Sequence, residues 1–177
     1  GCAIGLRPIN FHLEALKKMG AEIEIESGHV KARAKGGLKG AHIVFDKISV
    51  GATENILIAA TLAKGTTIIE NAALEPEVMA LVDMLVSMGA KITQKERVFT
   101  IEGVDSLSAA KVTVMPDRIE AGSYALATLI TDGEVELKGI NRDVFQSIEQ
   151  TLLDVGADIT EIEDGLLVKK SHKAKNN

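Results

Sequence analysis

Tryptophan is absent from this chain of 177 residues, and aromatic residues make up only 3% of it. A hydrophobic content of 46% still suffices for a core, which must be built mainly from Ile, Val, Leu, Ala and Met. The single cysteine excludes an internal disulfide and therefore a secreted scaffold held by disulfides. No apolar run approaches the roughly 20 residues that span a bilayer, and no signal-peptide pattern is present. We therefore expect a soluble, cytoplasmic protein that does not insert into membranes.

The net charge argues against a nucleic-acid-binding protein, and the spacing of the histidines argues against a zinc-binding one. The formal net charge of −5 argues against a nucleic-acid-binding surface, which normally needs a basic face. The one basic cluster, residues 169–175, is expected to be a solvated, frayed tail. The histidines do not have the spacing of metal ligands, so with one cysteine a structural zinc site is not expected.

A self-similar unit of about 70 residues runs almost three times through the chain. Gly-Ala dipeptides recur at positions 20–21, 89–90 and 156–157, each after an amphipathic run and before a short alternating one. The stretch Asp46–Gly51 returns 71 residues later as Asp117–Gly122. The first copy lacks its front half, so we expect this chain to be part of something longer.

Periodicity predicts that each complete unit runs helix, strand, helix, strand, strand, with a closing strand that leads into the next unit. Helices are predicted at 9–19, 52–63, 75–88, 121–131 and 143–155. Strands are predicted at 22–26, 29–34, 42–45, 66–70, 91–94, 97–102, 111–115, 134–138, 158–162 and 166–169. One nearly all-apolar helix and one amphipathic helix per unit favour helices packed together with the sheets outside. Pro116 interrupts the ladder and marks the best domain boundary.

The first stretch suited to chemistry is the loop Gly1–Pro8. Its glycines permit a tight, mobile turn, and Arg7 is a fork-shaped donor for carboxylate or phosphate. Cys2 beside this cation is either a partly ionised, reactive thiol or an inert small hydrophobe. His12, on the helix that follows, either lines the same cleft or is a partly buried structural histidine.

The second stretch, Lys47–Thr53, runs from a strand into an apolar helix. The free N–H groups of a helix start, a capping Ser49 or Thr53, and the charge of Lys47 together suit a phosphate group. Part of this signal is shared by any helix with a serine cap, and the Gly-Lys-Ser/Thr order of a Walker loop is absent.

Two further groups of charged residues can be explained by a structural role. Asp117 and Arg118 occupy the equivalent place in the next unit and form either a second polar site or a structural ion pair. Glu75 and Glu77 are better explained as first-turn helix charges than as an acid–base pair.

Five stretches in order along the chain resemble the enolpyruvyl transferase family, and within it the enzymes that use a nucleotide sugar as acceptor. They are residues 1–8, 40–44, 46–53, 65–73 and 116–120. The resemblance covers essentially the whole chain. It implies an α/β fold, an inside-out barrel or prism of βαβαββ repeats with helices inside and sheets outside, incomplete here. Residues 1–115 would be a partial first domain of two repeat units, the first incomplete, and residues 116–177 the first unit of a second domain plus the tail.

The resemblance implies transfer of enolpyruvate from phosphoenolpyruvate to the 3′-hydroxyl of UDP-N-acetylglucosamine, with release of phosphate. In bacteria this is the first committed, cytoplasmic step of peptidoglycan synthesis, on which cell shape and division depend. It implies no metal and no organic cofactor, and it leaves the oligomeric state unknown.

The resemblance also implies site residues. Cys2 matches the cysteine that donates a proton and is alkylated by fosfomycin. Contacts to the substrates are implied for Arg7, Pro8, Ile9, Asn10, Phe11, Lys47, Ser49 and Val50, and His12, Asp117 and Arg118 are further candidates. Asn10 departs from the family, which commonly has aspartate there, so the chain lacks one carboxylate acceptor at that point.

Two other functions compete with this one. A sister enzyme transfers enolpyruvate to shikimate 3-phosphate, but it lacks the cysteine loop and needs no nucleotide site. A non-catalytic repeat module is not excluded by composition. Because the family's chains are more than twice as long, we also expect this segment alone to show no turnover and to self-associate through uncovered apolar helix faces.

Overall fold

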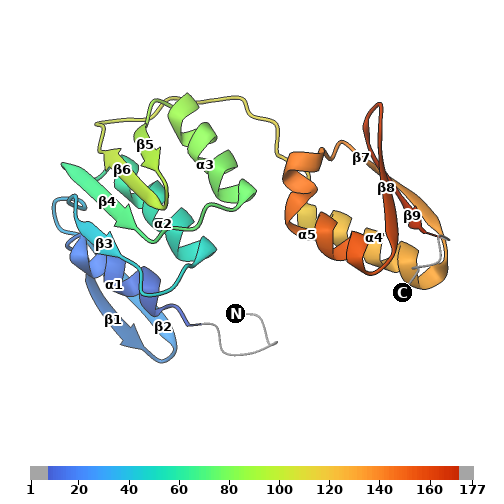
Figure 1. The fold of residues 1–177 in the computed structure, drawn as a ribbon. Coiled ribbons are helices and arrows are strands. Elements are labelled where there is room, and N and C mark those ends of the chain that lie inside the picture. Colours follow the sequence, from blue (N-terminus) through green and yellow to red (C-terminus); the bar gives the residue numbers. More distant parts are fainter. Residues whose placement is uncertain (1–7, 172–177) are drawn as a thin grey trace. The chain divides into compact units, whose positions relative to one another are not determined.

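The computed structural model describes residues 8–171. They form two compact units, unit 1 up to Thr113 and unit 2 from Val114 onward. In each unit helices cover one face of a β-sheet (Figure 1).

Unit 1 contains three helices in its described part, together with a hairpin and a four-stranded sheet. The helices are α1 (Asn10–Lys18), α2 (Val50–Thr61) and α3 (Pro76–Ser87). The hairpin consists of β1 (Glu22–Glu26) and β2 (His29–Arg33). The sheet consists of β3 (His42–Val44), β4 (Thr66–Glu70), β5 (Lys91–Lys95) and β6 (Val98–Glu102).

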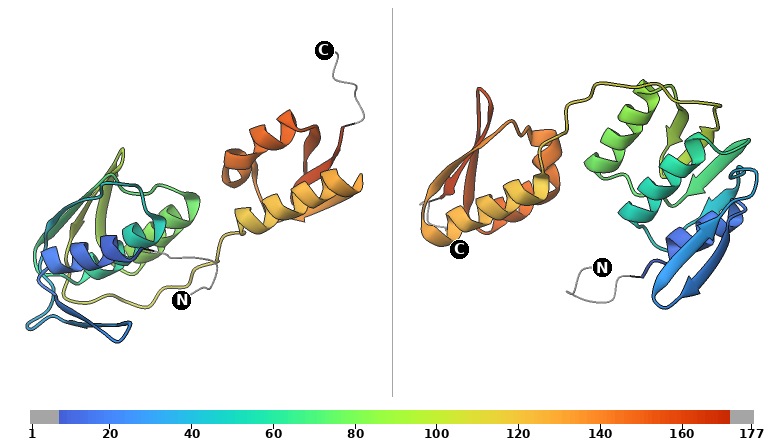
Figure 2. Two further views of the ribbon diagram at one scale, coloured as in Figure 1. Left: turned by 90° about the horizontal axis from the view of Figure 1, so that it is seen from below. Right: turned by 180° about the vertical axis from the view of Figure 1, so that it is seen from behind.

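The four strands of the sheet in unit 1 lie in the order β3-β4-β6-β5. β3 runs parallel to β4, and the other neighbours are antiparallel. Alternate residues of β4 and β6 are buried, among them Ile69, Phe99 and Ile101. They meet Ile56 and Leu57 of α2, so the core lies between the sheet and the helices (Figure 2).

Unit 2 repeats this arrangement with fewer elements. Its described elements are α4 (Arg118–Thr131), β7 (Glu134–Lys138), α5 (Arg142–Asp154), β8 (Ala157–Ile162) and β9 (Gly165–Lys170). The antiparallel sheet has the order β7-β9-β8, which corresponds to β4-β6-β5 of unit 1. Phe145, Leu152, Leu166 and Val168 form the centre of its core. The repeat read from the sequence is therefore confirmed.

Side-chain caps fix where three helices begin. Ser49 caps α2, Asp117 caps α4 and Asn141 caps α5, each by accepting from a backbone N–H of the first turn. Consequently α2 begins at Val50 rather than at residue 52, and α4 at Arg118 rather than at residue 121. Periodicity marks only the repeating apolar residues of a helix, whereas a cap sets the residue at which its first turn begins.

The strand predicted at residues 111–115 is wrong. These residues have no regular secondary structure, and the side chain of Val114 is 87% exposed. A strand needs a neighbour for its hydrogen bonds, and residues 111–115 pair with none of the described strands.

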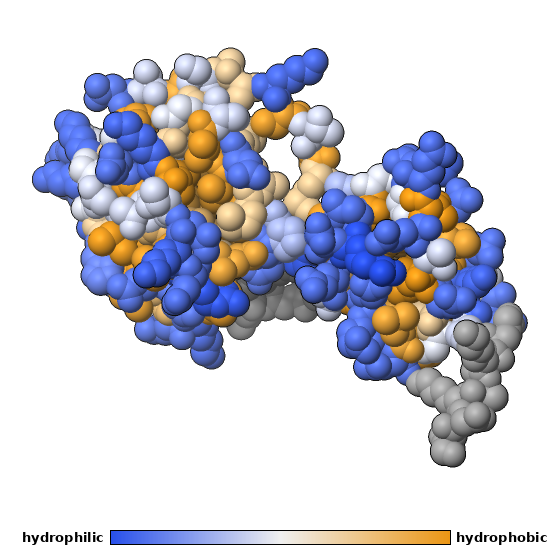
Figure 3. All heavy atoms as spheres, turned by 45° about the horizontal axis from the view of Figure 1, so that its top comes forward, coloured by the Kyte–Doolittle hydropathy of each residue, from blue (hydrophilic) through white to orange (hydrophobic). Residues whose placement is uncertain are grey.

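The apolar helices α2 and α4 are buried, as predicted, on the faces that they turn to the sheets. On α2, however, Ile58 is 52% exposed, and Leu62, which caps the end of this helix, is 54% exposed. On α4, Ile130 is 84% exposed. Hydrophobic side chains accordingly reach the surface in patches of both units (Figure 3). These helices therefore each have a second apolar face that the described residues leave open.

Candidate functional site

The first candidate stretch leads into α1. Cys2 and Arg7 lie outside the described residues, as does His172. Pro8, Ile9 and Asn10 are exposed, and α1 begins at Asn10. Phe11 is half-buried and packs edge-on against Phe45, with ring centroids 6.1 Å apart and an interplanar angle of 73°. This aromatic contact anchors the start of α1 beside the end of β3.

The second candidate stretch forms the start of α2. The Oγ of Ser49 accepts from the N–H of Ala52 at 3.3 Å, which confirms the predicted serine cap. Lys47 is exposed just ahead of the helix, and Val50 is its first residue. The remaining N–H groups of the first turn point out of the helix end, where the positive end of the helix dipole favours an anion.

His12 joins these two stretches. Its Nδ1 lies 3.1 Å from Nδ2 of Asn55, one turn into α2. A Cβ placed on Gly51 would lie 3.6 Å from Cε1 of the same imidazole, an ordinary contact distance. The starts of α1 and α2 thus lie side by side, although 43 residues separate His12 from Asn55 in the sequence. Sequence reasoning missed Asn55, whose only signal was an amide in a mainly apolar helix.

Carboxylates lie close to this helix start. Burial raises the pKa of the Glu54 carboxyl above its ordinary value, and the nearby carboxylate of Glu77 raises it further. Glu77 stands in the first turn of α3, behind Glu75 at the N-cap and Pro76 at the first helical position. The expectation that Glu75 and Glu77 mark a helix start is confirmed.

His29 and His42 are apart from this arrangement. His42 contacts the carboxylate of Glu70 at 2.6 Å on the exposed surface of the sheet, and His29 is exposed on the hairpin. Residues 8–171 contain no group of three or more His, Cys, Asp or Glu side chains placed to hold a metal ion. Across the same residues, no helix combines the length and apolar character that crossing a membrane requires.

Asp117 and Arg118 belong to unit 2. Oδ1 of Asp117 accepts from the N–H groups of Ile119 and Glu120 at 2.8 and 3.2 Å, so this carboxylate caps α4. Nη1 of Arg118 lies 3.5 Å from the Oγ of Ser147 on α5. The capping role explains the residue type at position 117 without a ligand.

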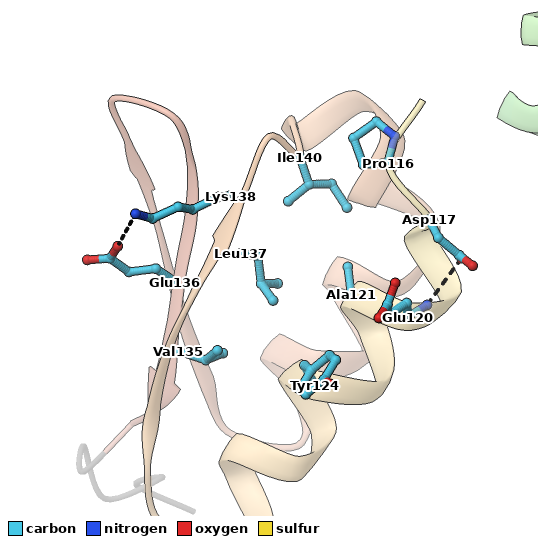
Figure 4. A pocket seen from close by; sticks show the side chains of 10 residues that line it. All are labelled: Pro116, Asp117, Glu120, Ala121, Tyr124, Val135, Glu136, Leu137, Lys138 and Ile140. Atoms are coloured by element: carbon cyan, nitrogen blue, oxygen red, sulfur yellow. Dashed lines mark hydrogen bonds and ion pairs between the residues drawn. The ribbon is translucent and has the colours of Figure 1, made fainter. Parts of the chain in front are cut away.

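A cavity of about 430 Å³ lies in unit 2 between the start of α4 and the outer edge of β7 (Figure 4). Its lining residues are Pro116, Asp117, Glu120, Ala121, Tyr124, Val135, Glu136, Leu137, Lys138 and Ile140. The one cation of the lining, Lys138, pairs with Glu136 at 3.8 Å, which leaves the carboxylates of Asp117 and Glu120. The lining is therefore mainly acidic and does not suit an anionic substrate. In unit 1 the corresponding place beside β4 is filled by β3, whose Ile43 is buried. The cavity therefore marks the position of a strand that the described part of unit 2 does not supply.

Comparison with known proteins identifies the relatives of this chain. The model of the EPSP synthase family, 3-phosphoshikimate 1-carboxyvinyltransferase, matches residues 1–177. The UDP-N-acetylglucosamine 1-carboxyvinyltransferases of Xanthobacter autotrophicus and Shewanella frigidimarina are 53% and 52% identical over 97% and 93% of the chain. That of Wolbachia pipientis is 48% identical over 97%. The chain spans 39–40% of the length of these relatives.

Solved structures agree with the fold. The enolpyruvyl transferase NikO from Streptomyces tendae superposes with a TM-score of 0.80 and 25% identity, over 94% of this chain and 43% of that one. An EPSP synthase from Acinetobacter baumannii superposes with a TM-score of 0.66 over 93% of this chain and 40% of that one, and its 24% identity bears on the fold alone. Family match, sequence identity and superposition lead to one conclusion: the chain belongs to the EPSP synthase family of enolpyruvyl transferases.

Proposed function

We propose that this chain is part of an enzyme that transfers enolpyruvate from phosphoenolpyruvate to the 3′-hydroxyl of UDP-N-acetylglucosamine and releases phosphate. The observation that carries the proposal is that the starts of α1 and α2 meet at His12. It is made in a chain about half identical to proteins named UDP-N-acetylglucosamine 1-carboxyvinyltransferase. The capped, outward-facing start of α2 with Lys47 ahead of it suits a diphosphate. The adjoining stretch Pro8–Phe11 would hold the rest of the nucleotide sugar.

The reaction is an addition followed by an elimination. A proton added to C3 of phosphoenolpyruvate makes C2 electrophilic, and O3′ of the sugar bonds to C2 as its own proton leaves. The resulting ketal then loses phosphate from C2 and a proton from C3, which restores the double bond. In this proposal Cys2 supplies the first proton and is the residue that fosfomycin alkylates, while Arg7 lies near both substrates. Closure of the loop over the substrates would exclude water.

The two units would be parts of two domains. Residues 1–115 would belong to the first domain and residues 116–177 to the second, while the compact units divide between Thr113 and Val114. In this proposal the rest of the substrate site comes from parts of the enzyme outside this chain, which spans 40% of the length of its Xanthobacter relative. We therefore expect the segment alone to release no phosphate. The whole enzyme would work in the bacterial cytoplasm at the first committed step of peptidoglycan synthesis, on which cell division depends.

The test uses the full-length protein that contains this sequence. Lys47→Ala should raise the KM for UDP-N-acetylglucosamine about tenfold to a hundredfold, the range expected for loss of one charge-assisted hydrogen bond. Cys2→Ser should abolish labelling by fosfomycin in the presence of the nucleotide sugar. Lys95→Ala, on the β5–β6 hairpin, is the matched control and should change neither. Wild-type KM and wild-type turnover in both site variants would refute the proposal.

A further inference from the structure

The hydrogen bond between His12 and Asn55 runs from the amide to the ring. The donor atom is the amide nitrogen Nδ2 of Asn55, which lies 3.1 Å from Nδ1 of His12. An amide nitrogen donates and does not accept, so Nδ1 must be the accepting, unprotonated nitrogen of the ring. In a neutral imidazole the hydrogen is then on Nε2.

The protonated nitrogen lies at the start of α2. A Cβ placed on Gly51, the second residue of this helix, would be 3.8 Å from Nε2 of His12 and 3.6 Å from Cε1. The imidazole edge opposite Asn55 therefore lies beside the first turn of α2. That turn has N–H groups without partners inside the helix.

We propose that Asn55 is a positioning residue that holds His12 as the Nε2–H tautomer, so that this N–H is a further donor to the diphosphate of the nucleotide sugar. The inference rests on the proposed function, because it places the diphosphate at the start of α2. Asn55 acts through His12 and does not itself touch the substrate. Its position one turn inside the helix, where it is half-buried, keeps it behind the imidazole.

This arrangement accounts for an amide at position 55. A carboxylate there would accept rather than donate and would favour the opposite tautomer, with hydrogen on Nδ1 and a bare Nε2 toward an anion. An apolar residue would leave Nδ1 without a partner and the tautomer unfixed. Of the three residue types, the donor at position 55 is the one that fixes the N–H of the neutral ring on the side of Gly51.

The first measurement concerns the tautomer itself. Long-range ¹H–¹⁵N spectra of full-length protein labelled with ¹⁵N-histidine, recorded with the ring neutral, should assign hydrogen to Nε2 of His12. Asn55→Asp should move it to Nδ1. Asn141→Asp is the matched control, because Asn141 caps α5 in unit 2 and aspartate keeps the accepting oxygen. Hydrogen on Nδ1 in the wild type would overturn the inference.

The second measurement separates positioning from a structural role. Asn55→Leu removes the donor at similar size and leaves the tautomer unfixed. It should raise the KM for UDP-N-acetylglucosamine about threefold to fivefold, less than the roughly tenfold of one fully lost hydrogen bond, and leave kcat within about twofold. In a His12→Ala background the same substitution should add little, since Asn55 acts through the ring. An undiminished effect without His12 would contradict the inference. If the wild type binds no nucleotide sugar, the proposed function fails and the diphosphate role fails with it, while the spectra still decide the tautomer.

Discussion

The side-chain oxygen of Thr53 accepts a hydrogen bond of 3.0 Å from the backbone N–H of Ala73, and both residues are fully buried. Thr53 lies in the first part of α2, and Ala73 in the segment between β4 and α3. This contact therefore ties the start of the helix that carries the candidate site to a neighbouring segment with no regular structure.

Thr53→Val should lower the free energy of unfolding by about 1–3 kcal/mol. Valine fills nearly the same volume but leaves the buried N–H of Ala73 without an acceptor, and an unmade buried hydrogen bond costs about that much. Denaturant unfolding measures the loss, and hydrogen exchange at the Ala73 amide locates it. Thr53→Ser keeps the hydroxyl and should keep that amide protected. Equal protection in the valine variant would show that the bond contributes nothing.

Gly103→Ala should be among the most damaging small substitutions in unit 1. A Cβ at position 103 would lie 1.6 Å from the backbone oxygen of Ala63, which cannot move without disturbing the end of α2. We expect a loss of about 3 kcal/mol or more, as for severe overpacking.

Gly122→Ala provides the contrast to Gly103→Ala. There the added Cβ meets only the side chain of Ile148, whose Cδ1 is nearest at 2.7 Å, and the end of a flexible side chain can turn away. The gain in helix propensity, about 1 kcal/mol, offsets the cost. Thermal unfolding of both variants decides the matter, and similar losses would mean that the backbone at position 103 yields as readily as a side chain.

Asp117→Ala should weaken the first turn of α4 by about 1 kcal/mol, the usual cost of losing an N-cap. The carboxylate accepts from the N–H groups of Ile119 and Glu120, which alanine would leave to solvent. Faster hydrogen exchange at these two amides is the direct readout. Asp117→Asn retains a capping oxygen and should exchange nearly as slowly as the wild type. Unchanged exchange at both amides in the alanine variant would contradict the capping role.

Much of the fold could be predicted from local pattern. The glycine-alanine repeats and the alternation after them located the hairpins, because a hairpin is specified by its own turn and strands. The strand at residues 111–115 failed for the opposite reason. Val112 and Val114 have the alternation of a strand, but pairing depends on a partner that sequence spacing does not place.

The candidate site was only partly accessible to sequence reasoning. The start of α2 could be predicted, because a serine cap ahead of an apolar helix is a local signal. The contact between His12 and Asn55 could not, since it depends on how α1 packs against α2 across 43 residues of sequence. A polar residue in an otherwise apolar helix indicates that some partner exists, but its identity is decided by tertiary packing.

Glu54 gives the chain a pH-dependent stability that can be measured. Burial, and then the charge of Glu77, raises the pKa of its carboxyl above the ordinary value of 4.5. The folded state therefore binds this proton more tightly than the unfolded state does. At a pH below the ordinary value the carboxyl is protonated in both states, and its ionisation costs no stability. As the pH rises through that value and then through the raised pKa, stability is lost.

Glu54→Gln removes this titration, so the variant should gain stability relative to the wild type as the pH rises from about 4 to about 7. Denaturant unfolding at several pH values gives the two curves. Glu77→Gln removes the second cause but not the burial, so the pH dependence contributed by Glu54 should shrink and persist. An advantage of Glu54→Gln that grows toward acid pH instead would mean that the folded state favours the ionised carboxylate, and that a cation or donor compensates its burial.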